Sequence, residues 1–254
     1  MTMPSTIHVS QAKTDISGAL ASKVAELAEQ AIREHRRFTV ALSGGSLMDI
    51  LCPALVSDPL RSRIDWTAWE VFWADERCVP LENPESNFAA AKMLLFDHVS
   101  IPREQIHALE DSLEPAAAAS AYQARLKEFF QPEASQLPRF DLILLGMGQD
   151  GHTASLFPGH ELLHEEQKWV APIFDAPKPP PQRITLTLPV INHAREVIFV
   201  VAGEGKAQPL QAVFDVQSSD HRPPAALVNP TRGNVTWFVD SAAAKNLTLL
   251  PDQS

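Results

Sequence analysis

The chain has 254 residues, of which 45% are apolar and 20% are charged, and its 31 acidic and 21 basic residues give a formal net charge of −10. This length and composition suit a single α/β domain spanning 1–254, and the charge argues against a nucleic acid or an anionic membrane as partner. Two cysteines, no apolar stretch of 18 residues and no visible secretory leader predict a cytoplasmic protein without a disulfide framework.

Apolar strands alternate with amphipathic helices along the chain. The first helix is marked by Leu20, Val24 and Leu27 at helical spacing. Helices are expected over 14–35, 47–55, 86–96, 116–130 and 206–216, and strands over 38–42, 70–73, 140–145, 183–188, 196–201 and 235–239. This alternation predicts an α/β fold of three αβα layers, in which a mostly parallel, Rossmann-like sheet carries helices on both faces. Ligands of such sheets bind beyond the carboxyl ends of the strands.

A glycine turn follows the strand at 38–42 and opens the next helix. It consists of Ser43, Gly44, Gly45 and Ser46. Glycine lets the backbone approach an oxyanion closely, and the free N–H groups of a helix start favour phosphate. An ordinary strand-to-helix turn explains the motif equally well. Because it lacks the lysine of a P-loop and the third glycine of a dinucleotide fingerprint, a nucleotide is not the expected ligand.

A second glycine-rich segment, GMGQDGHTAS at 146–155, follows the strand at 140–145. It presents His152 at a strand end, where an imidazole that titrates near neutral pH can accept a proton from water. The spacing alone leaves open a histidine that only hydrogen-bonds the loop. No Gly-x-Ser-x-Gly elbow is present, so a serine hydrolase is not predicted.

Charged residues at other strand ends are further candidates for the site. Asp75 and Arg77 follow the strand at 70–73, Arg183 opens a later strand, and Lys206 follows a glycine pair. Each of them also fits a solvated surface charge. His160 and His164 have the spacing of a metal pair, but no third ligand is suggested at a strand end, so no metal site is predicted.

The proline run PKPPP at 177–181 is interpreted as a rigid surface loop rather than a domain linker, because strand-like sequence follows it at once.

These residues together resemble the 6-phosphogluconolactonase family, and its eukaryotic members most. The matching segments are LSGGS at 42–46, DERCVP at 75–80 with ESN at 85–87, GMGQDGHTASLFP at 146–158, PKPPPQRITLTLP at 177–189, VAGEGKA at 201–207 and PAALV at 224–228. They keep the family order over nearly the whole chain, and the DGHTASLFP run is highly specific. Leu47 and Met48 depart from the Thr-Pro of many members, but a backbone phosphate cradle does not need those side chains.

The resemblance implies hydrolysis of 6-phosphoglucono-δ-lactone, a small sugar-phosphate substrate, by a monomer or weak homodimer without a cofactor. His152 would be the general base, and the Ser43–Ser46 turn with Arg183 and Lys206 would hold the phosphate. Arg77 would bind phosphate or polarise the carbonyl. Asp75 would hold sugar hydroxyls or orient His152.

Two alternatives stay open. Glucosamine-6-phosphate deaminases share the Ser-Gly-Gly-Ser turn and the Asp-Gly-His loop, but typically continue with Ile-Ala-Phe-Asn-Glu-Pro, where this chain has Thr153 to Pro158 as TASLFP. In a deaminase, an acid such as Asp75 would abstract a proton from carbon. A non-catalytic sugar-phosphate sensor is the other alternative, and the presence of His152, Asp75 and Arg77 counts against it.

Overall fold

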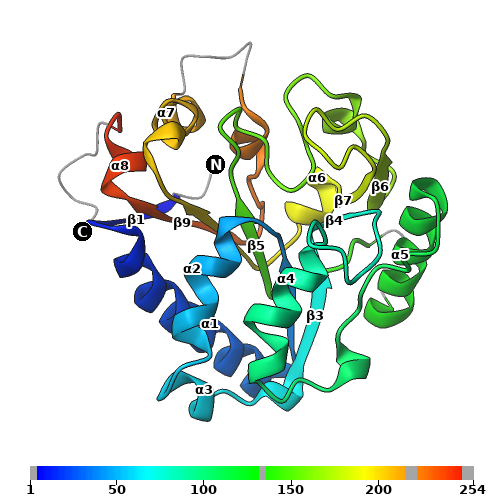
Figure 1. Cartoon of the computed structure of the whole chain (residues 1–254), viewed down its shortest axis with the longest axis horizontal. Helices are drawn as coiled ribbons and strands as arrows, with labels where there is room; N and C mark the ends of the chain where they lie inside the picture. Colours follow the sequence, from blue (N-terminus) through cyan, green and yellow to red (C-terminus); the bar gives the residue numbers. More distant parts are fainter. Residues whose placement is uncertain (1–4, 132–135, 216–221, 248–254) are drawn as a thin grey trace.

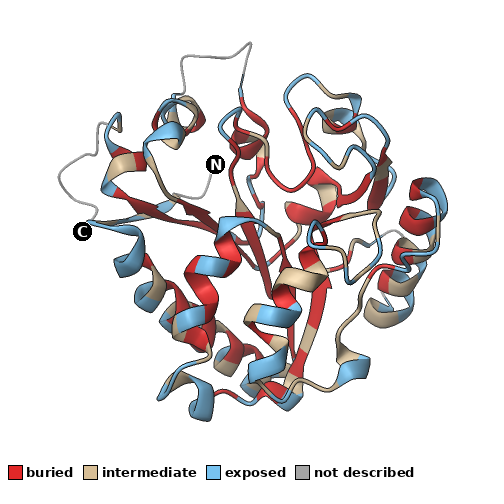
Figure 2. Ribbon diagram, in the orientation of Figure 1, coloured by how far each residue is buried: buried red, intermediate tan, exposed pale blue. Residues whose placement is uncertain are grey.

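A six-stranded, all-parallel sheet forms the centre of the computed structural model, which describes residues 5–131, 136–215 and 222–247. Across the sheet the strands are β1 (Thr6–Ser10), β9 (Asn234–Asp240), β8 (Glu196–Val201), β5 (Leu142–Gly146), β2 (Phe38–Leu42) and β3 (Trp69–Trp73) (Figure 1). The inner strands are buried along almost their whole length, as Figure 2 shows. Burial on both faces explains why they read as continuous apolar runs.

Three helices cover one face of this sheet. They are α1 (Lys13–His35), α2 (Ser46–Leu55) and α4 (Asn87–Leu94). The indole of Trp73 in β3 points to this side, where it packs edge-on against Phe88 of α4. α2 contacts both α1 and α4, so the three helices form one layer (Figure 1).

The opposite face carries α5 (Pro115–Phe130) and α7 (Ala207–Phe214). Side chains alternate along a strand, so Phe72 points away from Trp73 and packs against Phe129 of α5 at 5.1 Å between ring centroids. The strand register places Trp237 of β9 on the same face as Phe72, and Trp237 contacts Phe214 of α7. The predicted three-layer αβα arrangement is thereby confirmed.

A smaller antiparallel sheet lies beside the first, with strand order β4 (Asp75–Arg77), β7 (Arg183–Leu186) and β6 (Val170–Ile173). The expected strand at 183–188 therefore lies outside the parallel sheet. It ends at Leu186, because the short helix α6 (Leu188–Ile191) begins directly after Thr187. All residues of β7 are buried. The sequence of a buried strand does not distinguish a parallel sheet from an antiparallel one, so the pattern could not predict this placement. Two further short helices are α3 (Leu60–Arg63) and α8 (Ser241–Ala244).

The strand order reverses between β2 and β5, so successive strands are added to the sheet on opposite sides of this point. From β2 the chain adds β3 at one edge, whereas β5, β8 and β9 extend the sheet the other way. The loops that leave β2 and β5 consequently diverge and leave a crevice at the carboxyl ends of the strands. The two glycine-rich segments singled out in the sequence are these two loops.

Most predicted elements match the structure closely. The strand at 38–42 is exact in its bounds, and the helix expected over 206–216 is found over 207–214, with position 216 outside the described residues. Three strands of the described residues were not predicted: β1, which is largely exposed at a sheet edge, the charged β4, and the four-residue β6. Among the described residues, no helix is both long and apolar enough to cross a membrane.

Ser86 caps α4, which begins one residue later than the helix expected over 86–96. Its hydroxyl accepts the N–H groups of Phe88 at 3.1 Å and Ala89 at 3.4 Å. We expect Ser86→Ala to lower the free energy of unfolding by about 1–2 kcal/mol, measured by urea denaturation. The control Ser120→Ala, on the exposed side of α5, should change it by less than about 0.5 kcal/mol. Equal effects of the two substitutions would contradict the cap.

Candidate active site

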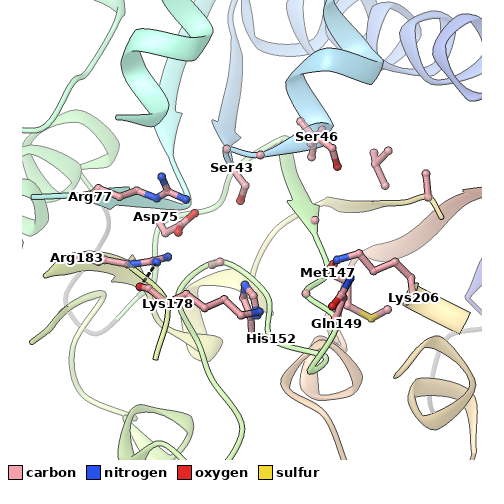
Figure 3. Close-up of a pocket in the computed structure, with 18 residues that line it drawn as sticks. Ser43, Ser46, Asp75, Arg77, Met147, Gln149, His152, Lys178, Arg183 and Lys206 are labelled. Atoms are coloured by element: carbon pink, nitrogen blue, oxygen red, sulfur yellow. Dashed lines mark hydrogen bonds between the residues drawn. The ribbon is translucent and has the colours of Figure 1, made fainter. Parts of the chain in front are cut away.

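A cavity of about 330 Å³ opens at the carboxyl ends of the central strands (Figure 3). Its walls come from the loops after β2, β5 and β8, and from β4 and β7 of the small sheet. All nine site residues predicted from the sequence line it, namely Ser43, Gly44, Gly45, Ser46, Asp75, Arg77, His152, Arg183 and Lys206. Residues far apart in the chain therefore meet at the position where the strand order reverses.

The Ser43–Ser46 turn brings the N-terminus of α2 to the cavity. Gly45 precedes the helix with φ 73°, a conformation that favours glycine, and it has no side chain to cap the first N–H groups. These N–H groups and the helix dipole favour an anion at this wall.

Gly44 has a packing role that the sequence did not suggest. A Cβ atom at this position would overlap the side-chain amide of Asn87 in α4. The Asn87 amide donates from Nδ2 to the Asp75 carbonyl at 2.8 Å, so the turn packs directly onto the group that positions Asp75.

Glu76 fixes the small sheet to the start of α4. Its carboxylate is fully buried and accepts the backbone N–H groups of Arg77 at 2.7 Å, Asn87 at 2.8 Å and Phe88 at 2.8 Å. Burial raises the pKa of Glu76 to about 6, against the opposing effect of these hydrogen bonds. Sequence reasoning missed this residue because an Asp-Glu-Arg triplet reads as a solvated charge run.

Asp75 and Arg77 flank Glu76 and face the cavity (Figure 3). The Asp75 side chain is 5% exposed and accepts the hydroxyl of Ser155 at 2.7 Å. Arg77 donates from Nη1 to the Glu85 carbonyl at 2.5 Å, and its buried Nε has no hydrogen-bond partner among the described residues. A carboxyl group and a guanidinium with spare donors thus share one wall.

His152 lies at the floor of the cavity in contact with Asp150. Its Nδ1 is 2.5 Å from the Asp150 carboxylate and 3.3 Å from the Lys178 ammonium. Burial lowers the pKa of His152 below its ordinary value against the opposing effect of Asp150, and Lys178 lowers it further. Burial of Asp150 works against its ionisation, but the hydrogen bond and charge of His152 lower its pKa to about 2.

The ionised carboxylate of Asp150 therefore accepts the proton on Nδ1 of His152, and Nε2 of the imidazole keeps its lone pair. The sequence had suggested Asp75 as one residue that could orient His152. In the structure Asp150 makes that contact, and Asp75 bonds Ser155 instead.

The other two predicted cations, Arg183 and Lys206, differ in how many of their N–H donors already form hydrogen bonds within the protein. Arg183 is 3% exposed and uses four of its five N–H groups, on the carbonyls of residues 178–180 and on the Ser155 hydroxyl. Lys206 donates from Nζ to the Met147 carbonyl at 2.6 Å, which holds its ammonium at the cavity wall. Burial and the nearby Lys178 lower the pKa of Lys206.

Besides Glu76, three more residues were missed by sequence reasoning: Gln149 and Lys178, which line the cavity, and Asp150, which contacts His152. Lys178 lies in the proline-rich run, and its position between prolines was the signal that could have singled it out. The run is a surface loop as predicted, and it packs beside the cavity.

A metal pair at His160 and His164 finds no support in the described part of the chain. His160 accepts the N–H of Leu162 through Nδ1, and its Nε2 contacts Asp175 at 3.2 Å. No group of three or more His, Cys, Asp or Glu side chains capable of holding a metal ion occurs among the described residues.

The chain is similar to known proteins over nearly its whole length. Residues 11–237 match the family described as glucosamine-6-phosphate isomerases/6-phosphogluconolactonase. Human 6-phosphogluconolactonase is 43% identical over 250 residues, covering 97% of this chain and 95% of the human protein. A probable 6-phosphogluconolactonase of Schizosaccharomyces pombe is 44% identical over 243 residues, covering 91% of this chain and 92% of its own. The solved 6-phosphogluconolactonase of Trypanosoma brucei superposes with a TM-score of 0.86 at 28% identity, covering 97% and 100% of the two chains.

The packing of Gly44 on Asn87 makes a prediction that a simple phosphate cradle does not. Gly44→Ala should displace the Asn87 amide and reduce both stability and ligand binding at the cavity. Adding Asn87→Ala should restore part of the loss of Gly44→Ala, because it removes the overlapping atoms. Urea denaturation of the two single variants and the double variant measures this coupling. Strictly additive effects would show that Gly44 does not act through Asn87.

Proposed function

Because the chain belongs to the glucosamine-6-phosphate isomerase/6-phosphogluconolactonase family, we propose how its cavity carries out the activity of the lactonase branch. The reaction is hydrolysis of 6-phosphoglucono-δ-lactone to 6-phosphogluconate in the oxidative pentose phosphate pathway. The observation that supports our mechanism most is the His152–Asp150 contact, which orients the imidazole of His152 in the same cavity as a helix N-terminus.

In the proposed mechanism, water attacks C1 of the lactone while Nε2 of His152 takes one of its protons. The carbonyl oxygen gains negative charge, and Arg77 supplies N–H donors and positive charge for it. The bond from C1 to the ring oxygen then breaks, and the imidazolium returns the proton to the ring oxygen. Asp150 holds the ring orientation throughout, and the cycle ends with the imidazole neutral.

We assign the phosphate to the side of the cavity where Ser46 and Lys206 lie in Figure 3, away from Arg77 and Arg183. The first N–H groups of α2 and the Lys206 ammonium supply donors and positive charge there. Arg183 has one N–H left after its four hydrogen bonds, so its predicted part in the phosphate clamp is small. Binding energy at the phosphate then serves to position C1 against His152.

Asp75 is assigned to sugar hydroxyls, since its carboxylate lines the cavity and bonds the Ser155 hydroxyl. No cofactor has a part in this mechanism.

We also propose that residues 1–254 form one domain, since one continuous hydrophobic core joins the two sheets. A cytoplasmic location and a monomeric or weakly dimeric state remain predictions from the sequence.

One assay separates the lactonase from the two alternatives. Hydrolysis of the phosphorylated lactone, with the spontaneous rate subtracted, should be accelerated, and glucosamine 6-phosphate should release no ammonia. Ammonia release would assign the deaminase reaction. Tight phosphosugar binding without turnover of either compound would assign the sensor.

The protonation state of His152 predicts the acid limb of the pH profile. Because the folded-state pKa lies below the ordinary 6.5, the imidazole is neutral at pH 7, and kcat/KM should fall only as the pH drops below 6.5. His152→Gln should lower kcat by about 10²–10⁴-fold while phosphosugar binding changes little. Steady-state kinetics over the pH range and a binding titration of the variant measure both effects. An unchanged kcat in His152→Gln would rule out the general-base role.

The assignment of Lys206 predicts a change of substrate preference. Lys206→Ala should weaken binding of 6-phosphogluconate by about 1.5–3 kcal/mol, the strength of a charge-assisted hydrogen bond. The ratio of kcat/KM for phosphorylated over plain gluconolactone should fall with it, because the plain lactone has no phosphate to hold. The control Lys245→Ala changes an exposed lysine that pairs with Glu204 and should leave the ratio unchanged. If Lys206→Ala also leaves it unchanged, the phosphate binds at the other side of the cavity.

A further inference from the structure

Lys178 is the cation nearest to the imidazole of His152 among the described residues, although it was not among the site residues predicted from the sequence. Its Nζ lies 3.3 Å from Nδ1 of His152 and 3.2 Å from the Asp150 carboxylate that pairs with the same nitrogen. The side chain lines the cavity, reaching it from the proline-rich loop beneath (Figure 3).

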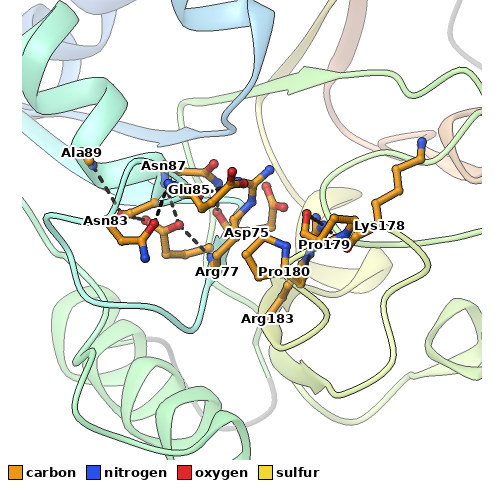
Figure 4. A network of polar contacts seen from close by, with 12 residues as sticks. Asp75, Arg77, Asn83, Glu85, Asn87, Ala89, Lys178, Pro179, Pro180 and Arg183 are labelled. Atoms are coloured by element: carbon orange, nitrogen blue, oxygen red, sulfur yellow. Dashed lines mark hydrogen bonds and ion pairs between the residues drawn. The ribbon is translucent and has the colours of Figure 1, made fainter.

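The position of this lysine is set by the guanidinium of Arg183. Nε donates to the Pro180 carbonyl at 2.8 Å, and Nη2 donates to the Lys178 carbonyl at 2.7 Å and the Pro179 carbonyl at 3.3 Å (Figure 4). Three consecutive carbonyls thus converge on one buried side chain, and proline residues have no N–H with which to form an alternative ladder. Arg183 is the residue that holds this loop against the cavity.

We propose that Lys178 is a positioning residue that keeps His152 in its neutral, proton-accepting form, and that Arg183 acts on His152 mainly by holding Lys178 in place. This inference rests on the proposed function, in which His152 removes a proton from water. It gives Arg183 a second part in the reaction, beyond the phosphate clamp predicted from the sequence.

The other charges around His152 show why a cation is needed there. Asp150 on the same loop and Asp75 of the small sheet both favour the imidazolium. Arg77 and Arg183 line the wall that carries Asp75, and Lys206 lies on the β8 side of the cavity. Lys178 opposes the two acids in two ways: its charge repels the imidazolium, and its bond to Asp150 reduces the pull of that carboxylate on the proton.

Both effects lower the pKa of His152, so removing the lysine should raise that pKa. Lys178→Met should raise the titration midpoint of His152 by roughly 0.5–1 pH unit, because the charge is removed from a partly exposed pair. The acid limb of kcat/KM should move to higher pH by the same amount. Lys178→Arg keeps the charge and should leave both midpoints near those of the parent.

Arg183→Lys tests the second half of the proposal. This variant keeps the positive charge near His152, but an ammonium cannot reach three carbonyls in the planar geometry of a guanidinium. It should therefore shift the His152 midpoint upward as Lys178→Met does. The double variant with Lys178→Met should shift no further than either single variant, since both changes remove the same contact.

The experiment is an NMR titration of the His152 imidazole in the full-length protein at low ionic strength, with His152→Gln identifying the resonance among nine histidines. The matched control is Lys168→Met, a surface lysine outside the cavity, which should change nothing. Thermal unfolding checks that each variant is folded, and Lys178→Met and Lys178→Arg decide the first half even if Arg183→Lys does not fold.

The outcomes separate the inference from the proposed function. An unchanged His152 midpoint in Lys178→Met overturns the role of Lys178. Fully additive shifts in the double variant overturn the claim that Arg183 acts through Lys178, and would assign its effect to Ser155 or to the Phe157 ring that it also contacts. If the parent protein hydrolyses no lactone, the proposed function fails, whereas the NMR midpoints still report whether Lys178 controls His152.

Discussion

The buried carboxylate of Glu76 is the interaction on which the geometry of the site depends. It lies in β4 of the small sheet and accepts N–H groups from the first turn of α4, a helix of the layer on the main sheet. The amide of Asn87 adds a further bond from α4 to the Asp75 carbonyl, and a single residue links β3 to β4. Because Asp75 and Arg77 are its neighbours in the chain, the position of Glu76 determines where an acid and a guanidinium face the cavity.

The chain is strongly acidic overall, yet it binds an anionic substrate, so the positive charge must be concentrated at the cavity. The net charge of −10 opposes the approach of a phosphate, so the attraction must act within the cavity. Arg77, Lys178, Arg183 and Lys206 line it together with the start of α2, against one lining carboxylate, Asp75. Each of these cations is also anchored to a backbone carbonyl or to a neighbouring side chain, so little side-chain ordering remains for substrate binding.

The sequence predicted the parts of the fold and site that depend on local pattern. Period and turn chemistry located β2, α2 and the two glycine loops. The strand-end rule together with the family resemblance selected nine residues that all line one cavity. The roles of individual residues depend on contacts between distant segments, which a pattern cannot show. Asp150 rather than Asp75 contacts His152, and Arg183 is occupied by the 178–180 loop. The strand at 183–186 pairs antiparallel with β4, which was not predicted because its three residues are all charged.

The pairing of β1 with β9 constrains how the protein folds as it is synthesised. β1 occupies a sheet edge, and its partner β9 follows it by more than two hundred residues, with Thr6 opposite Thr236. β1 therefore has no partner in the sheet until β9 has been synthesised. Strands β2, β3 and β5 can pair well before then, so the half of the sheet that carries both glycine loops can form ahead of the edge that completes it.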